Sequence, residues 1–255
     1  MINSYLQEGE ETIYLQQLIA DIRIDHPTLN CKAMYYKINP TIMGRDKFEK
    51  LCADLGFTIE RRKSRHITTD STGVIRFDNL LKDMTLTRIN QAYSSDITYY
   101  EINDVFYYIT FVIDCFSRRI LGYAVSHRLS TEQTTLPALK MAIKNRNNEL
   151  PEGIIFHSDG GGQYYCKAFL KLTGTHKFKN SMCEFSYHNG MVERLNGVIK
   201  NNYLKFKIIK TYHQLVKEVD CITTLYNNER PHKSLKYKTP IQYEKELLPS
   251  QNQQR

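Results

Sequence analysis

The sequence has no tryptophan, no long hydrophobic run and no cysteine pair of the C-x-x-C type. Its six cysteines are scattered, and none forms a cluster with histidine at the spacing of a zinc site. We therefore interpret them as reduced thiols, most of them in the core. The longest apolar stretch, 105–113, is too short to span a membrane, and the polar N-terminus does not have the pattern of a signal peptide. We expect a cytoplasmic protein without a membrane partner.

Acidic residues are scarce after residue 193, and positive charge accumulates there. The formal net charge is +8. Residues 194–240 carry ten Lys or Arg against three Asp or Glu, which accounts for nearly all of this surplus. A basic surface of this kind favours a polyanionic partner such as DNA, and its position assigns that partner to the second half of the chain.

Residues 1–60 are predicted to form a small all-α domain. Helical periodicity appears in three short segments between residues 11 and 57, with Asn30 placed to cap the second and Gly56 to end the third. The apolar stripe of the first segment comprises Ile13, Leu15, Leu18, Ile19 and Ile22. The pattern fits a helix-turn-helix-like module or a plain helical packing domain, and it leaves both open.

A basic and polar linker is predicted for residues 61–90. Arg61, Arg62 and Lys63 open it, and a run of Thr, Ser, Asp and Gly follows. The basic run is either a DNA contact between two domains or an ordinary solvated charge run.

Residues 91–210 are predicted to form an α/β core. Three strand patterns with short connections indicate an antiparallel meander, which helices and short strands follow. This order predicts a ribonuclease-H-like fold, a mixed sheet flanked by helices, preceded by the helix-turn-helix-like domain. Residues 211–255 are predicted to be a C-terminal helix and a basic tail, frayed from residue 249. The predicted strands are 94–100, 105–113, 120–126, 153–157 and 176–178, and the predicted helices are 131–144, 163–172, 191–206 and 213–227.

Three carboxylates lie where this fold would bring them together. Asp96 is inside the first strand, Asp159 follows a short apolar strand and precedes three glycines, and Glu193 is near the start of a helix. Carboxylates held close together repel and raise one another's pKa, and a pair of Mg²⁺ ions removes that penalty. Two such ions can promote an in-line displacement at phosphorus. Taken singly, Asp159 also fits a turn residue and Glu193 an exposed helix carboxylate.

The sequence around these acids resembles a known family. The segments Asp96–Tyr99, Val112–Ile120, His157–Tyr164, Glu193–Lys200 and Tyr226–Leu235 are similar, in this order, to the sequence boxes of insertion-sequence transposases of the IS-three group. The resemblance runs from about residue 15 to 243 and is to the second-frame catalytic protein with a retroviral-integrase-type core. Glu193 follows Asp159 slightly more closely than is usual in the family, and Tyr93 stands where the family usually has Trp.

The resemblance implies an activity and partners. It implies a DDE-type transposase, a polynucleotidyl transferase that cleaves and joins DNA at insertion-sequence ends by two-metal hydrolysis and transesterification. Asp96, Asp159 and Glu193 would be the catalytic and metal-binding residues, with two Mg²⁺ ions for which Mn²⁺ can substitute. The partners would be DNA ends and target DNA, further copies of the chain and the first-reading-frame product, in the nucleoid of a bacterial cytoplasm. Alternatives are a non-catalytic or decayed DNA-binding regulator and a structure-specific nuclease on the same fold.

Several basic residues are candidate DNA contacts. Lys200 lies seven residues after Glu193, two helical turns later, so it points the same way and could hold a phosphate. The alternative is a solvated lysine. The other candidates are Arg194, Arg230, His232 and Lys233, with Arg61, Arg62 and Lys63 in the linker. His232 also fits a turn cap.

Two further polar residues are assigned supporting roles. We predict that Asp114, at a strand end, hydrogen-bonds the turn at Ser117 and Arg118 rather than acting in catalysis. His157 is predicted to pack behind the metal site.

Overall fold

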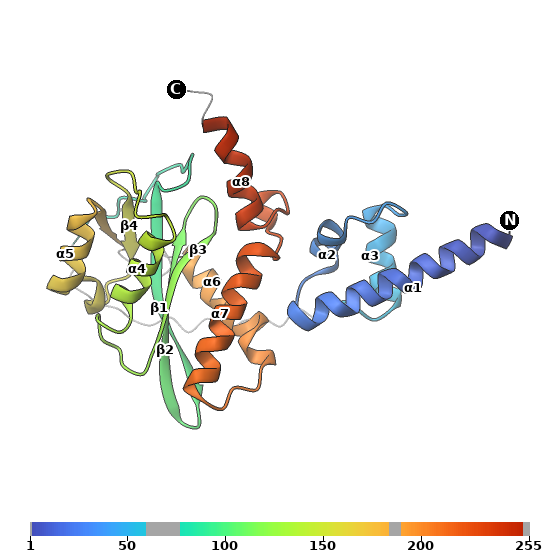
Figure 1. Ribbon diagram of the computed structural model, residues 1–255, viewed down its shortest axis with the longest axis horizontal. Coiled ribbons are helices and arrows are strands. Elements are labelled where there is room, and N and C mark those ends of the chain that lie inside the picture. Colours follow the sequence, from blue (N-terminus) through green and yellow to red (C-terminus); the bar gives the residue numbers. More distant parts are fainter. Residues whose placement is uncertain (1, 60–76, 184–189, 252–255) are drawn as a thin grey trace.

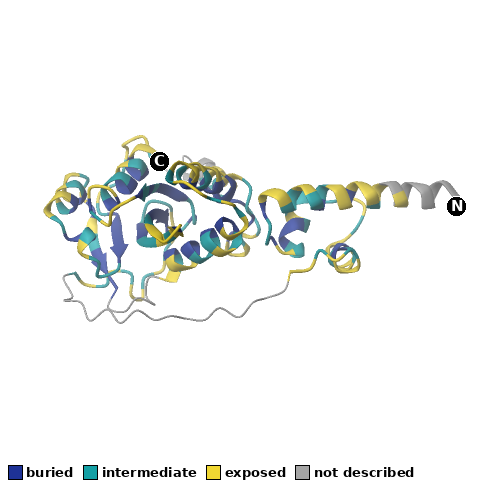
Figure 2. Cartoon of the chain, turned by 90° about the horizontal axis from the view of Figure 1, so that it is seen from below, coloured by how far each residue is buried: buried dark blue, intermediate teal, exposed yellow. Residues whose placement is uncertain are grey.

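The computed structural model describes residues 2–59, 77–183 and 190–251. Figure 1 shows a helical N-terminal domain beside an α/β core, and Figure 2 shows that buried residues concentrate in the interior of each part. None of the helices in the described ranges is both long and apolar enough to cross a membrane.

The N-terminal domain packs three helices: α1 (Ile2–Asp25), α2 (Cys31–Ile38) and α3 (Arg45–Asp54). Its core includes the fully buried side chains of Ile19, Met34 and Phe48. As predicted, Asn30 caps α2, where its side chain accepts a hydrogen bond from the Ala33 amide. The predicted apolar stripe is wrong at Ile13, which is 69% exposed, because among the described side chains of α1 those packed into this core begin at Leu15.

The N-terminal domain docks on the core through a small polar and aromatic contact. His26 Nδ1 lies 2.9 Å from the Tyr203 hydroxyl, and Lys37 Nζ lies 3.0 Å from Glu229 Oε2. The rings of Tyr36 and Tyr237 stack with centroids 4.2 Å apart. These contacts join α1 and α2 to the segments that follow α6 and α7.

The core contains a five-stranded mixed sheet in the order β3-β2-β1-β4-β5. Strands β1 (Ala92–Ile102), β2 (Val105–Asp114) and β3 (Ile120–Ser126) form the predicted antiparallel meander. Strands β4 (Ile155–Ser158) and β5 (Lys179–Met182) run parallel to β1. Strand β5 was predicted at 176–178, but it begins at Lys179, three residues after the predicted start. It has only four residues and a polar start, so it shows no alternation of its own.

Two helices cover each face of the sheet (Figure 1). Helices α4 (Thr135–Lys144) and α5 (Lys167–Thr175) pack on the face that carries Val112, and α6 (Gly190–Asn202) and α7 (Tyr212–Asn228) pack on the face that carries Phe111. Gly122 lets α4 approach β3, because an added Cβ there would lie 2.1 Å from the Ala138 carbonyl oxygen. Short 3-10 turns occupy 162–164, 204–206 and 233–235, so the helix predicted over 191–206 ends early, at Asn202.

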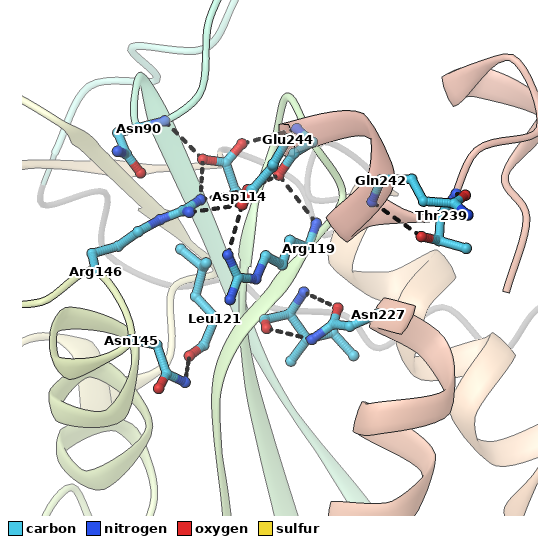
Figure 3. Close-up of polar contacts among 12 residues, drawn as sticks. Asn90, Asp114, Arg119, Leu121, Asn145, Arg146, Asn227, Thr239, Gln242 and Glu244 are labelled. Carbon is cyan, nitrogen blue, oxygen red and sulfur yellow. Dashed lines mark hydrogen bonds and ion pairs between the residues drawn. The ribbon is translucent and has the colours of Figure 1, made fainter. Parts of the chain in front are cut away.

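The C-terminal segment contains a further helix, α8 (Pro240–Gln251), where a basic tail was predicted, and residues 252–255 lie outside the described residues. Pro240 opens it, and Thr239 and Gln242 exchange the hydrogen bonds of a capping box, drawn in Figure 3. The prediction missed α8 because its sequence is mostly polar. One buried acid, Glu244, anchors it to the core.

Candidate active site

The site is built where two parallel strands diverge. Strands β1 and β4 pair from Ala92 to Ser94 of β1, and the last pair joins Ser94 to His157 of β4. Asp96 and Asp159 each lie two residues beyond that last pair. Because the carboxyl ends of parallel strands lie at the same edge of a sheet, the divergence brings both carboxylates to one place.

The loop after β4 orients Asp159. The Gly161 amide donates a hydrogen bond to Asp159 Oδ1 at 3.1 Å, and the Tyr165 hydroxyl donates to the Asp159 carbonyl oxygen at 3.2 Å. A Cβ on Gly161 would lie 3.0 Å from the same carboxylate oxygen, which favours glycine at this position. Tyr164 ties the loop to β1, because its hydroxyl lies 2.9 Å from Ser95 Oγ.

Helix α6 brings Glu193 to the two strands. Its buried side chains Val192, Leu195 and Ile199 pack against the sheet, and Glu193 lies at the exposed edge of the helix. One helical turn later, Asn196 Nδ2 donates a 2.7 Å hydrogen bond to Asp96 Oδ2. This bond pins α6 to β1 directly at the carboxylates.

Asn196 was missed by sequence reasoning. It lies three residues after Glu193 and four before Lys200, so these three positions form one stripe along the helix. That spacing was the available signal, but an amide in a helix interior does not by itself point to a partner on a distant strand.

The carboxylates interact electrostatically, and this interaction changes the pKa of Asp96. Burial and the neighbouring charges of Asp159 and Glu193 raise the pKa of Asp96 to about 7, against the hydrogen bonds from Ile97 and Asn196, which lower it. Burial also raises the pKa of Asp159. The site therefore holds more negative charge than its surroundings balance.

This imbalance and the donor set fit a divalent cation. Carboxylate oxygens are the ligands that Mg²⁺ prefers, and a cation would relieve the repulsion at Asp96. Within the described ranges, no group of three or more His, Cys, Asp or Glu side chains is already gathered as a metal would require. Asp96 Oδ2 is held by Asn196, and Glu193 is exposed, so binding would draw the three side chains together.

Lys200 lies beside the site on an aromatic ring. Its ammonium sits 4.4 Å from the centroid of the Tyr99 ring, and burial lowers its pKa. The side chain thus leaves α6 toward β1, three residues beyond Asp96.

Some of the other predicted DNA contacts lie within the described residues, and the rest lie in the linker outside them. Burial, together with the positive charges of Arg230, Arg118 and Arg194, lowers the pKa of His232 to about 3. The His232 ring packs edge-on against Tyr226, with centroids 4.7 Å apart. Lys233 is exposed. Arg61, Arg62 and Lys63 lie outside the described residues, and a role in DNA binding stays a prediction for all of these residues.

Asp114 makes the predicted turn contacts. Its carboxylate accepts hydrogen bonds from the backbone amides of Phe116 and Ser117, and its carbonyl oxygen accepts one from the Arg118 amide. His157 is buried in β4, with Nδ1 2.9 Å from Ser181 Oγ. Both residues stabilise the strands that carry the site.

Comparison with known proteins agrees with this geometry. Two family models, both described as integrase core domain, match residues 87–186 and 177–240. Together the two matches span residues 87–240, more than half of the chain, so the chain belongs to the integrase core family. In sequence it is similar to transposases of IS3-type insertion sequences.

Its relatives in sequence are bacterial. The 31 kDa protein of insertion element IS600 from Shigella sonnei is 26% identical over 90% of this chain and 85% of its own length. The transposase InsF of insertion sequence IS3A from Escherichia coli is 30% identical over 73% of this chain, and the match spans 65% of InsF.

A solved structure shows the same fold. A chain of the simian T-cell lymphotropic virus intasome, determined in complex with PP2A regulatory subunit B56 gamma, has a TM-score of 0.51 at 17% identity. The match covers 80% of this chain and 67% of that chain. The predicted ribonuclease-H-like integrase core is confirmed. Whether the helical domain is a helix-turn-helix stays a prediction.

Proposed function

We propose that this chain is the catalytic protein of an insertion sequence, which cleaves DNA at the ends of the element and joins the freed strands to new sites. The observation that carries the proposal is the divergence of β1 and β4, which gathers Asp96 and Asp159 next to α6 and leaves their charge unbalanced. Membership of the integrase core family supports the reaction class.

Asp96, Asp159 and Glu193 would hold the metal, as two Mg²⁺ ions or Mn²⁺ in their place. The ions would supply charge neutralisation for the attacking and leaving oxygens at phosphorus. The residues of the chain prepare that site. Asn196 holds the Asp96 carboxylate toward α6, and the Gly161 amide holds Asp159.

The basic residues would hold the DNA backbone. The positive charges of Arg118, Arg194 and Arg230 all act on His232, and guanidinium groups recognise phosphate oxygens in a fixed geometry. His232 is neutral at pH 7, so it would contribute a hydrogen bond rather than a charge. DNA, further copies of the chain and the first-frame product of the element are the proposed partners.

The decisive experiment is a metal-dependent cleavage and joining assay. A labelled duplex that carries the terminal sequence of the element is incubated with the protein and Mg²⁺, Mn²⁺ or a chelator. We expect cleavage at the element boundary and joined products with either metal, and neither with the chelator. Cleavage without joining would favour a nuclease, and binding without cleavage under any condition would favour a regulator.

Salt dependence tests the proposed backbone contacts. If phosphate contacts dominate, the logarithm of the binding constant should fall linearly with the logarithm of salt concentration, with a slope of about −0.9 for each phosphate neutralised. A flat dependence would contradict an electrostatic DNA surface.

A further inference from the structure

The hairpin between β1 and β2 exposes two aromatic rings. Tyr99 is 56% exposed and Phe106 is 47% exposed. Their ring centroids are 5.4 Å apart, with ring planes at 90°. In Figure 1 this hairpin turn lies at the bottom of the core. Clustered exposed aromatic side chains are uncommon on a surface that binds nothing.

One member of the aromatic pair, Tyr99, lies on the strand that carries Asp96 and contacts Lys200 from the helix that carries Glu193. Tyr99 is three residues after Asp96 on β1, roughly 10 Å along the strand. Strand β1 pairs with β4 only up to Ser94 in the described chain, and along the stretch beyond it Lys200 reaches the Tyr99 ring from α6. A DNA strand held at the carboxylates and continuing in this direction would meet Lys200 and Tyr99 within one or two nucleotides.

The charges around the pair define what can bind there. Lys200 covers part of the Tyr99 ring and supplies one positive charge. Beyond it, Glu101 lies opposite Phe106 in the hairpin, and Asp104 follows in the turn. These carboxylates would repel the phosphates of a DNA strand that ran along the hairpin. A single base with its phosphate toward Lys200 fits both the rings and the charges.

We propose that Tyr99 and Phe106 form a stacking surface for an unpaired base next to the reacting phosphate, and that Lys200 contacts the phosphate of that nucleotide. This inference rests on the proposed function. The faces of bases inside a duplex are covered by their neighbours, so the surface selects a base that is terminal, frayed or single-stranded. Stacking on aromatic side chains tolerates any base, which gives a preference for DNA form rather than for sequence.

The test measures binding in the presence of a chelator, so that no cleavage occurs. Two duplexes carry the terminal sequence of the element, one fully paired and one with unpaired bases at its end, with 2-aminopurine at the terminal positions. We expect Tyr99→Ala and Phe106→Ala to weaken binding of the unpaired end roughly 5- to 100-fold and to abolish quenching of 2-aminopurine. Binding of the paired duplex should change much less. Tyr99→Phe should behave like the wild type, because it keeps the ring.

Val105→Ala is the matched control. Val105 lies in the same hairpin and is 51% exposed, but it has no ring to stack. Its binding and quenching should equal those of the wild type. If Val105→Ala is as defective as the aromatic variants, and sedimentation shows that all three change the oligomeric state, the surface is a protein interface and the proposal is overturned.

Failure of this inference differs from failure of the proposed function. If the wild type binds both duplexes and Tyr99→Ala and Phe106→Ala bind and quench as it does, the stacking surface is wrong and the transposase proposal stands. If the wild type binds neither duplex, both fail. Thermal melts of each variant exclude loss of folding as the cause.

Discussion

Two aspartates on neighbouring strands, Asp114 fully buried and Asp96 half-buried, have different surroundings. The Asp114 carboxylate accepts hydrogen bonds from the backbone amides of Asn90, Phe116 and Ser117, and lies 3.4 Å from the Arg146 guanidinium (Figure 3). The Asp96 carboxylate accepts hydrogen bonds from the Asn196 side-chain amide and the Ile97 backbone amide, and the charges of Asp159 and Glu193 act on it. Both aspartates have a raised pKa because of burial. The charges of Asp159 and Glu193 raise the pKa of Asp96 further, whereas the charge of Arg146 lowers the pKa of Asp114 more than the charge of Glu244 raises it.

The difference shows how to tell a structural carboxylate from a functional one. Around Asp114, three backbone donors and the arginine offset part of the cost of burial, and the acid fastens a turn. Around Asp96 the neighbouring carboxylates add to that cost, which a proton or a bound cation would relieve. The number of hydrogen-bond donors around each carboxylate distinguishes the two residues better than their burial does.

The largest expected effect is on catalysis. Asp96→Asn, Asp159→Asn and Glu193→Gln should each lower the cleavage rate by about 10³-fold or more, because a metal ion contributes several kcal/mol to a phosphoryl transition state. DNA affinity should change little. Single-turnover cleavage of the end duplex measures the rate, and a filter-binding titration measures the affinity.

The thermal stability of these variants sharpens the comparison. Asp96→Asn should melt at the same temperature as the metal-free wild type or higher, because it removes a repelled charge. Asp114→Asn should melt lower, because it weakens charged hydrogen bonds to three amides. Equal shifts for both variants would mean that the two sites do not differ as described.

The next largest effect is on folding. Glu244 bonds Ser117, Arg119 and Arg146, and it shares Arg146 with Asp114. Glu244→Ala would leave two partly buried guanidinium groups short of a partner, and we expect a loss of about 3–5 kcal/mol in the free energy of unfolding. Urea denaturation measures it. The cleavage rate per folded molecule should stay near that of the wild type, and a rate loss like that of Asp96→Asn would place Glu244 in the active site.

A smaller effect is expected where an amide supports the catalytic carboxylate. Asn196→Ala should lower the cleavage rate roughly 10- to 100-fold, because a hydrogen bond to a charged group is worth about 1.5–3 kcal/mol. The matched control is Asn227→Ala. Asn227 is also a buried helix amide, but it bonds the backbone of Ile120 and not the site. It should lose stability and keep its rate, whereas the reverse pattern would reject the role of Asn196.

The smallest effect concerns pH. Burial favours a higher pKa for Glu244, but the hydrogen bonds and charge of Arg146 outweigh it, and the pKa is lowered from 4.5. The unfolded chain therefore binds the proton first, and stability is lost as pH falls below 4.5, by at most about 1.4 kcal/mol per pH unit. Melting temperatures between pH 5 and pH 3 should show a shallower decline in Glu244→Gln than in the wild type.

Local patterns made much of the fold predictable. The three long strands follow from alternation and short turns, and the Asn30 cap follows from its position before an apolar segment. Asp96 and Asp159 were singled out because each lies at a recognisable break in the pattern, whereas Glu193 was assigned through the resemblance of the sequence around it. Asp159, for example, stands between a buried strand and a glycine loop.

The rest depends on contacts between distant parts of the chain. The bond from Asn196 to Asp96 joins residues 100 positions apart, and the bonds from Glu244 to Arg119 and Arg146 span 125 and 98 positions. In the sequence, Glu244 looks like a surface acid in a polar helix. The direction of Lys200, toward Tyr99, depends on how α6 lies against β1, which helical periodicity alone does not specify.

The closure of the sheet edges has a consequence for assembly. At β3, Asn227 satisfies both the amide and the carbonyl of Ile120, and Asn145 donates to the Leu121 carbonyl (Figure 3). At the opposite edge, the Met182 amide donates to the Asp78 carbonyl. A strand from a second molecule would have to displace these partners before it could extend the sheet. Pairing of two copies edge to edge is therefore disfavoured at these positions, and we expect an ordered multimer to form through helices and loops instead.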